Sequence, residues 1–327
     1  MTSDAISKEE LDQYDRQIRL WGIDAQKRLR KANVLIIGLG GLGSEVVKNI
    51  VLTGVNSITL LDWRNVVQED LNSQLLITPD CVDQNIAESS RNRAQELNPN
   101  VQICVDSDHV TRKDEKFFQQ FDVICLTLSD EKLRLKMNTI CRLKNIKFFS
   151  GDVFGFFGYF FTDLGNIYEY VVEVPAKKTD HEPEKAKVDK TVTVKRVTEF
   201  CTYADAMEED WTKRSRKSLK NSSSVFFIIQ IYDEFKRNFN RPPQDGDKDA
   251  LLEIKRKVLS RNGMKESFLS DDFVDFCRSA LSPVCAIVGG VLGQEMIKAI
   301  SGKDQPHNNF FFYDGLKHLG VVDKISP

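Results

Sequence analysis

A glycine-rich turn between a buried strand and a helix constrains the fold of this chain more than any other feature. Gly38, Gly40 and Gly43 form the pattern G-x-G-x-x-G at the end of the apolar run 34–38, and Asp62 ends the next apolar run. Glycines let the backbone approach a phosphate, the following helix offers free N–H groups, and the acid can bind ribose hydroxyls. The pattern therefore predicts a site for an adenosine-containing ligand, a description that NAD, FAD and ATP all satisfy.

The first half of the chain alternates apolar strands with amphipathic helices. Strands are expected at 34–38, 57–62, 101–105 and 121–128, and helices at 7–31, 44–53, 85–97 and 130–144. Ser7 and Glu10 have the spacing of a capping box at the start of the first helix. Continuously apolar strands between helices indicate a mostly parallel sheet with helices on both faces. The expected fold class is therefore α/β and Rossmann-like.

The second half of the chain changes character twice. Seven of the 21 phenylalanines fall within 148–161, where glycine-broken strands favour a buried core over a protein interface. The segment 175–223 carries many charges of both signs and is expected to be a partly disordered insertion. Helical patterns return at 225–239, 249–260, 271–280 and 284–300, before a strand at 310–315. We therefore divide the chain into a first α/β part (1–174), the insertion (175–223) and a second α/β part (224–327).

Composition excludes several functional classes. The 327 residues carry a net charge of −2, which gives no overall electrostatic reason to bind nucleic acid or an acidic membrane surface. No apolar run approaches the roughly 20 residues that span a bilayer, and the polar, acidic amino terminus is unlike a secretory or mitochondrial signal. The seven cysteines and four histidines lack the paired spacings of a metal site. We expect an intracellular protein that binds neither membrane, nucleic acid nor a structural metal.

Four segments together resemble the ubiquitin-like-protein activating enzymes: YDRQIRLWG at 14–22, GLGGLGSE at 38–45, the phenylalanine-rich run at 148–161, and the segment 283–315. The resemblance covers nearly the whole chain except 175–223. It implies a Rossmann-like adenylation fold paired face to face with a second one. It also implies that ATP and magnesium are used to adenylate the carboxyl-terminal glycine of a ubiquitin-like protein. Within the family, the chain is most similar to the heterodimeric branch that acts on SUMO.

The chain departs from the pattern of active members at their phosphate-binding positions. Ser73 stands where the family's Asn-x-x-Arg-Gln motif carries its arginine. Asp83 and Ile86 replace the glycine and the lysine of a following Gly-x-x-Lys motif. Each missing cation removes about 3 kcal/mol of electrostatic stabilisation from the transition state of phosphate chemistry. The pocket of this chain, formed by Gly38, Gly40, Gly41, Gly43 and Asp62, is therefore expected to be a degenerate nucleotide site.

Two further catalytic features of the family are weakened or missing. The magnesium-linked aspartate aligns with Ser129, although a shift of one residue would place Asp130 there, and Arg134 is retained. The paired cysteines of the family's zinc site are missing. None of the seven cysteines has a recognisable thioester-forming context, and Cys201 is the least implausible candidate. These departures indicate the non-catalytic member of a pair.

The resemblance assigns one positive role to this chain. In the family, an arginine of the YDRQ-type segment crosses the dimer interface and contacts the ATP phosphates bound by the other adenylation fold. Arg16 occupies that position, and Arg19 is the second choice. The alternative for Arg16 is an exposed helix ion pair with Asp12 or Asp15, which composition alone would favour.

The resemblance thus implies a regulatory subunit whose catalytic partner holds ATP and magnesium, carries the acceptor cysteine and binds SUMO. It also implies a nuclear as well as cytoplasmic location, with the basic run 213–220 as weak support. Three alternatives remain: a self-sufficient homodimeric adenylating enzyme of the sulfur-carrier type, a nicotinamide-dependent oxidoreductase, and a binding module that retains a nucleotide fold.

Overall fold

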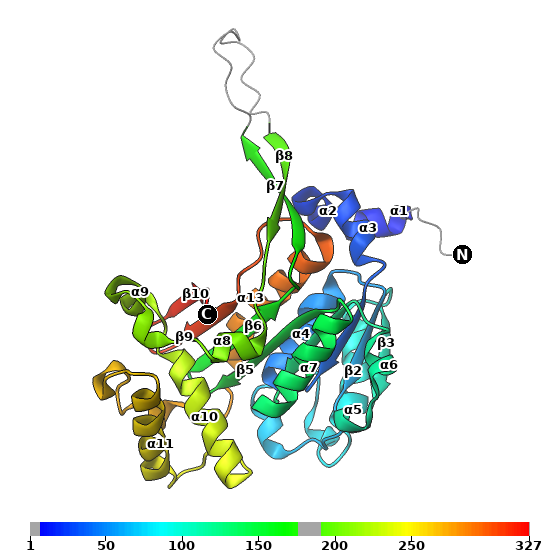
Figure 1. Ribbon diagram of the computed structural model, residues 1–327. Coiled ribbons are helices and arrows are strands. Elements are labelled where there is room, and N and C mark those ends of the chain that lie inside the picture. The colour runs from blue at the N-terminus through cyan, green and yellow to red at the C-terminus, as the bar shows by residue number, and fades with distance from the viewer. Residues whose placement is uncertain (1–6, 176–190, 327) are drawn as a thin grey trace, which may run out of the picture.

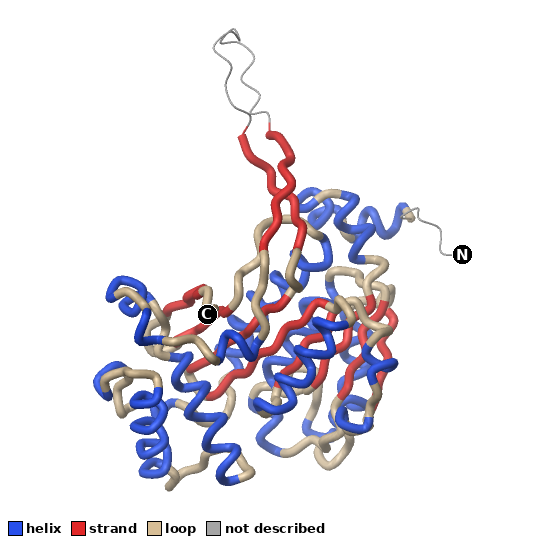
Figure 2. Tube along the Cα trace, in the orientation of Figure 1, coloured by secondary structure: helices blue, strands red, loops and turns tan. Residues whose placement is uncertain are grey.

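The structure is a computed structural model that describes residues 7–175 and 191–326. One eight-stranded sheet crosses the molecule in the order β10-β9-β6-β5-β4-β1-β2-β3 (Figures 1 and 2). The strands from β3 to β5 are parallel, and β6, β9 and β10 continue the sheet in antiparallel fashion. Their bounds are β1 Asn33–Ile37, β2 Ser57–Leu61, β3 Gln102–Asp106, β4 Val123–Thr127, β5 Lys147–Phe154, β6 Phe157–Asp163, β9 Phe310–Asp314 and β10 Leu319–Asp323. The predicted α/β class with a mostly parallel sheet is confirmed.

Helices bury both faces of this sheet. Along β1, Val34 and Ile36 join one apolar cluster, with α4, α5 and α13, while Leu35 and Ile37 join a second, with α7, α10 and α11. This alternation follows from the two-residue period of a strand whose faces are both covered. The helix bounds are α4 Gly41–Leu52, α5 Ile86–Leu97, α6 Glu115–Phe118, α7 Glu131–Leu143, α10 Val225–Phe239, α11 Lys248–Arg261, α12 Phe273–Phe276 and α13 Ser282–Ser301.

The phenylalanine-rich run forms β5, β6 and the turn between them. Six of its seven phenylalanines are buried, and Phe156 in the turn is the exposed one. Gly155, in that turn, has φ of +59°. The expectation of a core rather than an interface is therefore confirmed for most of the run.

The expected insertion at 175–223 is folded where the structure describes it. β7 (Tyr168–Pro175) pairs antiparallel with β8 (Thr191–Thr198), and this ribbon projects from the body (Figure 1). The short helices α8 (Tyr203–Met207) and α9 (Arg216–Asn221) follow. Tyr203 and Trp211 are fully buried, so aromatic side chains tie the described part of this charged segment to the body. The rest of the expected insertion, 176–190, lies outside the described residues.

The amino-terminal helix predicted over 7–31 is instead three helices, α1 (Lys8–Gln13), α2 (Asp15–Trp21) and α3 (Ile23–Leu29). The capping box of Ser7 and Glu10 is confirmed by both of its hydrogen bonds. The chain breaks at Tyr14 and again at Gly22, whose φ of +87° ends α2. The prediction was wrong here because a helical periodicity alone does not report a glycine stop.

Helix α13 has the length and composition of a membrane span, although Gln294, Glu295 and Lys298 interrupt its apolar run. However, 61% of its apolar window is buried inside the protein, between α4 and the sheet. One helix of this kind is typical of a core helix in a globular fold. The helix expected over 271–280 is reduced to the single turn of α12.

Candidate functional site

The glycine turn lies at the carboxyl ends of the parallel strands, between β1 and α4, as the motif predicts. Gly40 is the N-cap of α4 and offers no side-chain hydrogen bond to the helix. The hydroxyl of Thr127, the last residue of β4, donates to the carbonyl of Gly38 at 2.7 Å. The turn therefore has the backbone arrangement that phosphate-binding turns use.

Asp62, the expected ribose acid, is already engaged by this chain. Its carboxylate is fully buried and accepts hydrogen bonds from the Leu39 amide at 2.8 Å and from the Arg64 amide at 3.0 Å. The Arg64 guanidinium adds bonds at 3.2 Å and 2.9 Å. Burial alone would lower the pKa of Arg64. The negative charge of Asp62 and its hydrogen bonds act in the opposite direction, and the pKa of Arg64 is raised. A ribose would have to displace this buried ion pair to reach Asp62.

The two positions that lack the family's cations are filled by other groups. Ser73 lies against the turn, where a Cβ on Gly41 would approach its Oγ to 2.7 Å. Ile86 is the first residue of α5 and is fully buried in the core. Asp83, which replaces a glycine of the family pattern, keeps a left-handed backbone with φ of +68°. Here the backbone matches the family pattern while the charges do not.

The end of β4 is also closed by side chains of this chain. Leu128 lies over the glycine turn, because a Cβ on Gly40 would come within 2.7 Å of its Cδ1. The Ser129 carbonyl accepts bonds from Arg134 and from Lys236 of α10, each at 3.0 Å. Two cationic side chains are therefore bound to the backbone at the end of β4.

Asp130, the alternative metal ligand, serves as the N-cap of α7 through a bond from the Leu133 amide at 2.7 Å. No group of three potential metal-ligating side chains occurs among the residues that the structure describes. The Asp130 carboxylate is therefore already engaged by the backbone of its own helix.

Arg16 and Arg19 both lie on α2 and both are exposed. Arg19 forms a bidentate pair with Asp15, through bonds of 3.0 Å from Nε and from Nη2. Arg16 forms no ion pair or hydrogen bond with any described residue. The helix ion pair considered for Arg16 is thus taken by Arg19, which leaves the Arg16 guanidinium available to a group outside the chain.

The helix that carries Arg16 is anchored on both sides of that residue. Tyr14 is only 2% exposed, and its hydroxyl accepts a hydrogen bond from the Asn98 side chain at 2.9 Å. Its ring lies against Gly54, where a Cβ would approach Tyr14 Cζ to 2.5 Å and where φ is +75°. Gln17 donates to the carbonyl of Leu52, at the end of α4, at 3.0 Å. A helix of seven residues is marginal alone, so these contacts fix where Arg16 points.

Cys201, the candidate thioester cysteine, has the surroundings of a structural residue. Its sulfur donates to the carbonyl of Ile325 at 3.3 Å and accepts from the Asn309 side chain at 2.9 Å. Burial raises the pKa of the Cys201 thiol, although the bond from Asn309 acts in the opposite direction. A raised pKa opposes formation of the nucleophilic thiolate.

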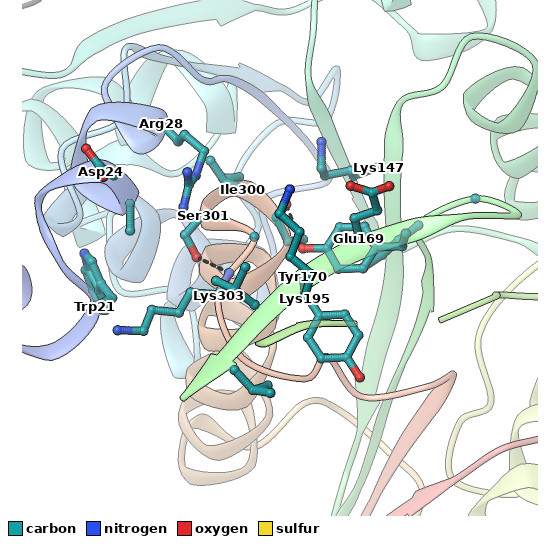
Figure 3. A pocket seen from close by; sticks show the side chains of 18 of the residues that line it. Trp21, Asp24, Arg28, Lys147, Glu169, Tyr170, Lys195, Ile300, Ser301 and Lys303 are labelled. Atoms are coloured by element: carbon teal, nitrogen blue, oxygen red, sulfur yellow. Dashed lines mark hydrogen bonds between the residues drawn. The ribbon is translucent and has the colours of Figure 1, made fainter. Parts of the chain in front are cut away.

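A cavity of about 810 Å³ lies away from the glycine turn (Figure 3). Lys147, the first residue of β5, lines it, so the cavity lies at the amino ends of the parallel strands. The α2–α3 junction, the β7–β8 ribbon and the end of α13 form its other walls. The sequence analysis did not anticipate this cavity, because its walls come from segments far apart in the chain.

Sequence reasoning also missed the side chains that close the turn and anchor α2. Tyr14 begins the YDRQ segment, and Arg64 follows Asp62 by two residues. The sequence therefore contained a signal for both side chains. Leu128, Asn98 and Lys236 gave no comparable signal, since their roles depend on how distant elements pack.

Comparison with known proteins gives a consistent result. The model of the ThiF family matches residues 14–325. A protein of Danio rerio described as SUMO-activating enzyme subunit 1 is 47% identical over 335 residues, covering 98% of this chain and 96% of its own length. The human protein of the same description is 44% identical over 336 residues, covering 98% and 97%. The crystal structure of E. coli MccB with succinimide has the same fold, with a TM-score of 0.58 at 13% identity over 96% of this chain and 72% of that one.

Proposed function

The chain belongs to the ThiF family, and we propose that it is the non-catalytic subunit of a heterodimeric SUMO-activating enzyme. Its relatives named as subunit 1 of that enzyme match it along almost their whole length, which supports a subunit of the same kind. The observation that carries the non-catalytic assignment is the contrast between two sites. In the chain's own pocket Asp62 is paired with Arg64, whereas Arg16 pairs with no described residue and is held on an anchored helix.

The chemistry of adenylation explains why the chain's own pocket would be silent. Charge develops across the triphosphate during the reaction, and cations placed in advance supply most of its stabilisation. Ser73 and Ile86 supply none, and the fully buried Ile86 cannot be replaced by a cation without cost to the core. We therefore place ATP and magnesium mainly in the catalytic partner, together with the acceptor cysteine and the principal contacts to SUMO.

Arg16 would complete the partner's site in trans. A guanidinium offers a planar fork of donors that stays charged at any physiological pH, and this suits the oxygens of a phosphate. Because the group belongs to another chain, the site is complete only in the heterodimer. This dependence would make the subunit regulatory although it holds no substrate of its own.

We also propose that the protein is nuclear as well as cytoplasmic, as the resemblance implies. The basic run 213–220 is weak support, since Arg214 within it is paired with Glu209 and Asp323 and packs on the Trp211 ring. Redistribution of a fluorescent fusion after substitution of the exposed Lys213 would test whether this run contributes.

Pyrophosphate exchange in the presence of SUMO tests the proposed function. The assay compares this chain alone, its catalytic partner alone, and the mixture, and we expect full activity in the mixture. Arg16→Ala should lower that activity about 100-fold while the heterodimer still forms, as one transition-state cation is removed. Arg256→Ala is the matched control, because it removes an exposed arginine from α11, on the other side of the molecule (Figure 1).

Two results would contradict the proposal. Exchange by this chain alone would select the self-sufficient homodimeric enzyme, which the relatives do not favour. Full activity of the Arg16→Ala heterodimer would remove the trans-acting role.

A further inference from the structure

Five cationic and four acidic side chains line the cavity at the amino ends of the parallel strands, an excess of one positive charge. Arg142 and Lys303 in its walls are neutralised by Asp163 and Glu173. Arg28, Lys147 and Lys195 also line it, and they form no ion pair with any residue in the described ranges 7–175 and 191–326. Two further carboxylates line the cavity: Asp24, which lies 3.8 Å from Lys27, and Glu169.

The three unpaired cations reach the cavity from three separate elements. Arg28 belongs to α3, Lys147 begins β5, and Lys195 belongs to β8 of the projecting ribbon (Figure 3). Since these elements are far apart in sequence, local helix or strand geometry does not account for the convergence. Like charges that face one opening repel each other, and an anion between them would relieve the repulsion.

Lys147 gives the strongest indication of a missing anion. Burial lowers the pKa of its ammonium, and the charge of Asp122 acts in the opposite direction. Lys147 is half-buried and forms no ion pair with a described carboxylate, so its charge is only partly compensated. Such incomplete compensation is common where a side chain is kept for binding rather than for stability.

Apolar side chains stand beside these cations. Ile167 is 72% exposed and Ile23 is 44% exposed, and Trp21 lines the same cavity. An inorganic anion would leave these side chains in water, whereas a peptide can place a carboxylate on the cations and an apolar side chain on the isoleucines. The volume of about 810 Å³ is within the range of sites that enclose a ligand of several residues or a cofactor.

We propose that this cavity is a docking site for an acidic, partly apolar peptide segment of a partner protein. The segment lies between the α2–α3 junction and the β7–β8 ribbon, with its carboxylates on Arg28, Lys147 and Lys195. This role is separate from that of Arg16 and does not depend on it. It assigns a binding function to the β7–β8 ribbon, whose second strand lies in the segment expected to be a partly disordered insertion.

Fluorescence anisotropy on the full chain tests the proposal with a labelled peptide of alternating glutamate and leucine as the probe. We expect saturable binding that weakens as salt is added, because salt screens the ion pairs. Lys147→Met should weaken binding about tenfold, the equivalent of one charge-assisted hydrogen bond. Lys147→Arg should retain most of it, and Lys257→Met on α11 is the control for loss of an exposed lysine.

Thermal unfolding without peptide provides a second readout. Lys147→Met should unfold at a higher temperature than the unmodified chain, since it replaces a poorly compensated, half-buried ammonium with an apolar group. A purely structural lysine would give the opposite sign, so a lower unfolding temperature overturns the role given to Lys147.

Three binding results would overturn the proposal. The first is equal affinity for a peptide with lysine in place of glutamate, and the second is unchanged affinity of both Lys147→Met and Arg28→Ala. The third is complete displacement of the peptide by millimolar inorganic phosphate at constant ionic strength, which would identify a site for small anions instead.

Discussion

Replacing Tyr14 with alanine should abolish the contribution of Arg16 without removing Arg16 itself. Tyr14 is buried against Gly54 and bonded to Asn98, yet it belongs to neither of the two main apolar clusters. Truncation of a buried aromatic side chain costs about 3–5 kcal/mol, which exceeds what a seven-residue helix can supply for itself. The loss should therefore release α2 locally and leave the sheet folded.

The loss of rate in Tyr14→Ala cannot exceed the contribution of Arg16, the residue that Tyr14 positions. If Arg16 supplies about 3 kcal/mol to the transition state, Tyr14→Ala should lower the rate of pyrophosphate exchange by up to about 100-fold. Tyr14→Phe removes one neutral hydrogen bond of about 1 kcal/mol, so its effect should be about fivefold at most. The assay is exchange by the reconstituted heterodimer, with kcat separated from the KM for ATP and with association of the subunits measured independently.

A double-mutant cycle separates positioning from general destabilisation. In an Arg16→Ala background, Tyr14→Ala and Tyr14→Phe should have no further effect on the rate, because the group they position is gone. Equal losses in the presence and absence of Arg16 would refute the positioning argument. An unaffected Arg16→Ala heterodimer would instead refute the trans-acting role on which the argument rests.

Three other predictions follow from single contacts. Arg19→Ala should change the free energy of unfolding by less than about 0.5 kcal/mol in urea titrations, because its pair with Asp15 is 78% and 48% exposed. Ile86→Lys should lower stability by more than about 3 kcal/mol and should not create ATP affinity in calorimetric titration, since it places an ammonium in the core beside an already paired Asp62. Burial lowers the pKa of His307, so the unfolded chain binds more protons and the native chain loses stability as pH falls below the ordinary value of 6.5; His307→Phe should flatten that part of the unfolding profile.

The succession of strands and helices along the first half of the chain was predicted well, because each buried element has its own apolar pattern. The helix over 225–239 has the expected bounds, and the strand at 57–62 differs by one residue. The predictions failed where a tertiary contact overrides composition. Trp211 and Tyr203 fold a segment whose charges indicate disorder, and no local pattern shows that their rings find a core.

In the candidate site, too, local motifs were predictable and tertiary contacts were not. Arg16, the glycines and Asp62 were located from motifs, and the structure puts them in the expected turn and helix. The motifs do not show which of these groups are already paired. Arg19 forms an ion pair with Asp15, and Arg64 forms one with Asp62. A motif reports which group is present, while the packing reports whether that group is free.

The glycines of the motif are required by packing as well as by any ligand. A side chain on Gly38 would collide with Thr127, and one on Gly43 would collide with the carbonyl of Gly38, so both glycines are required for α4 to pack on β1 and β4. Neither collision involves a nucleotide. Substitution at Gly43 would therefore be destabilising even in a chain that binds no ligand, and helix–strand packing accounts for Gly38 and Gly43 without a nucleotide. The residues that report on ligand binding are those that can change without loss of the fold, and in this pocket they include Ser73 and Leu128, which lie against the turn.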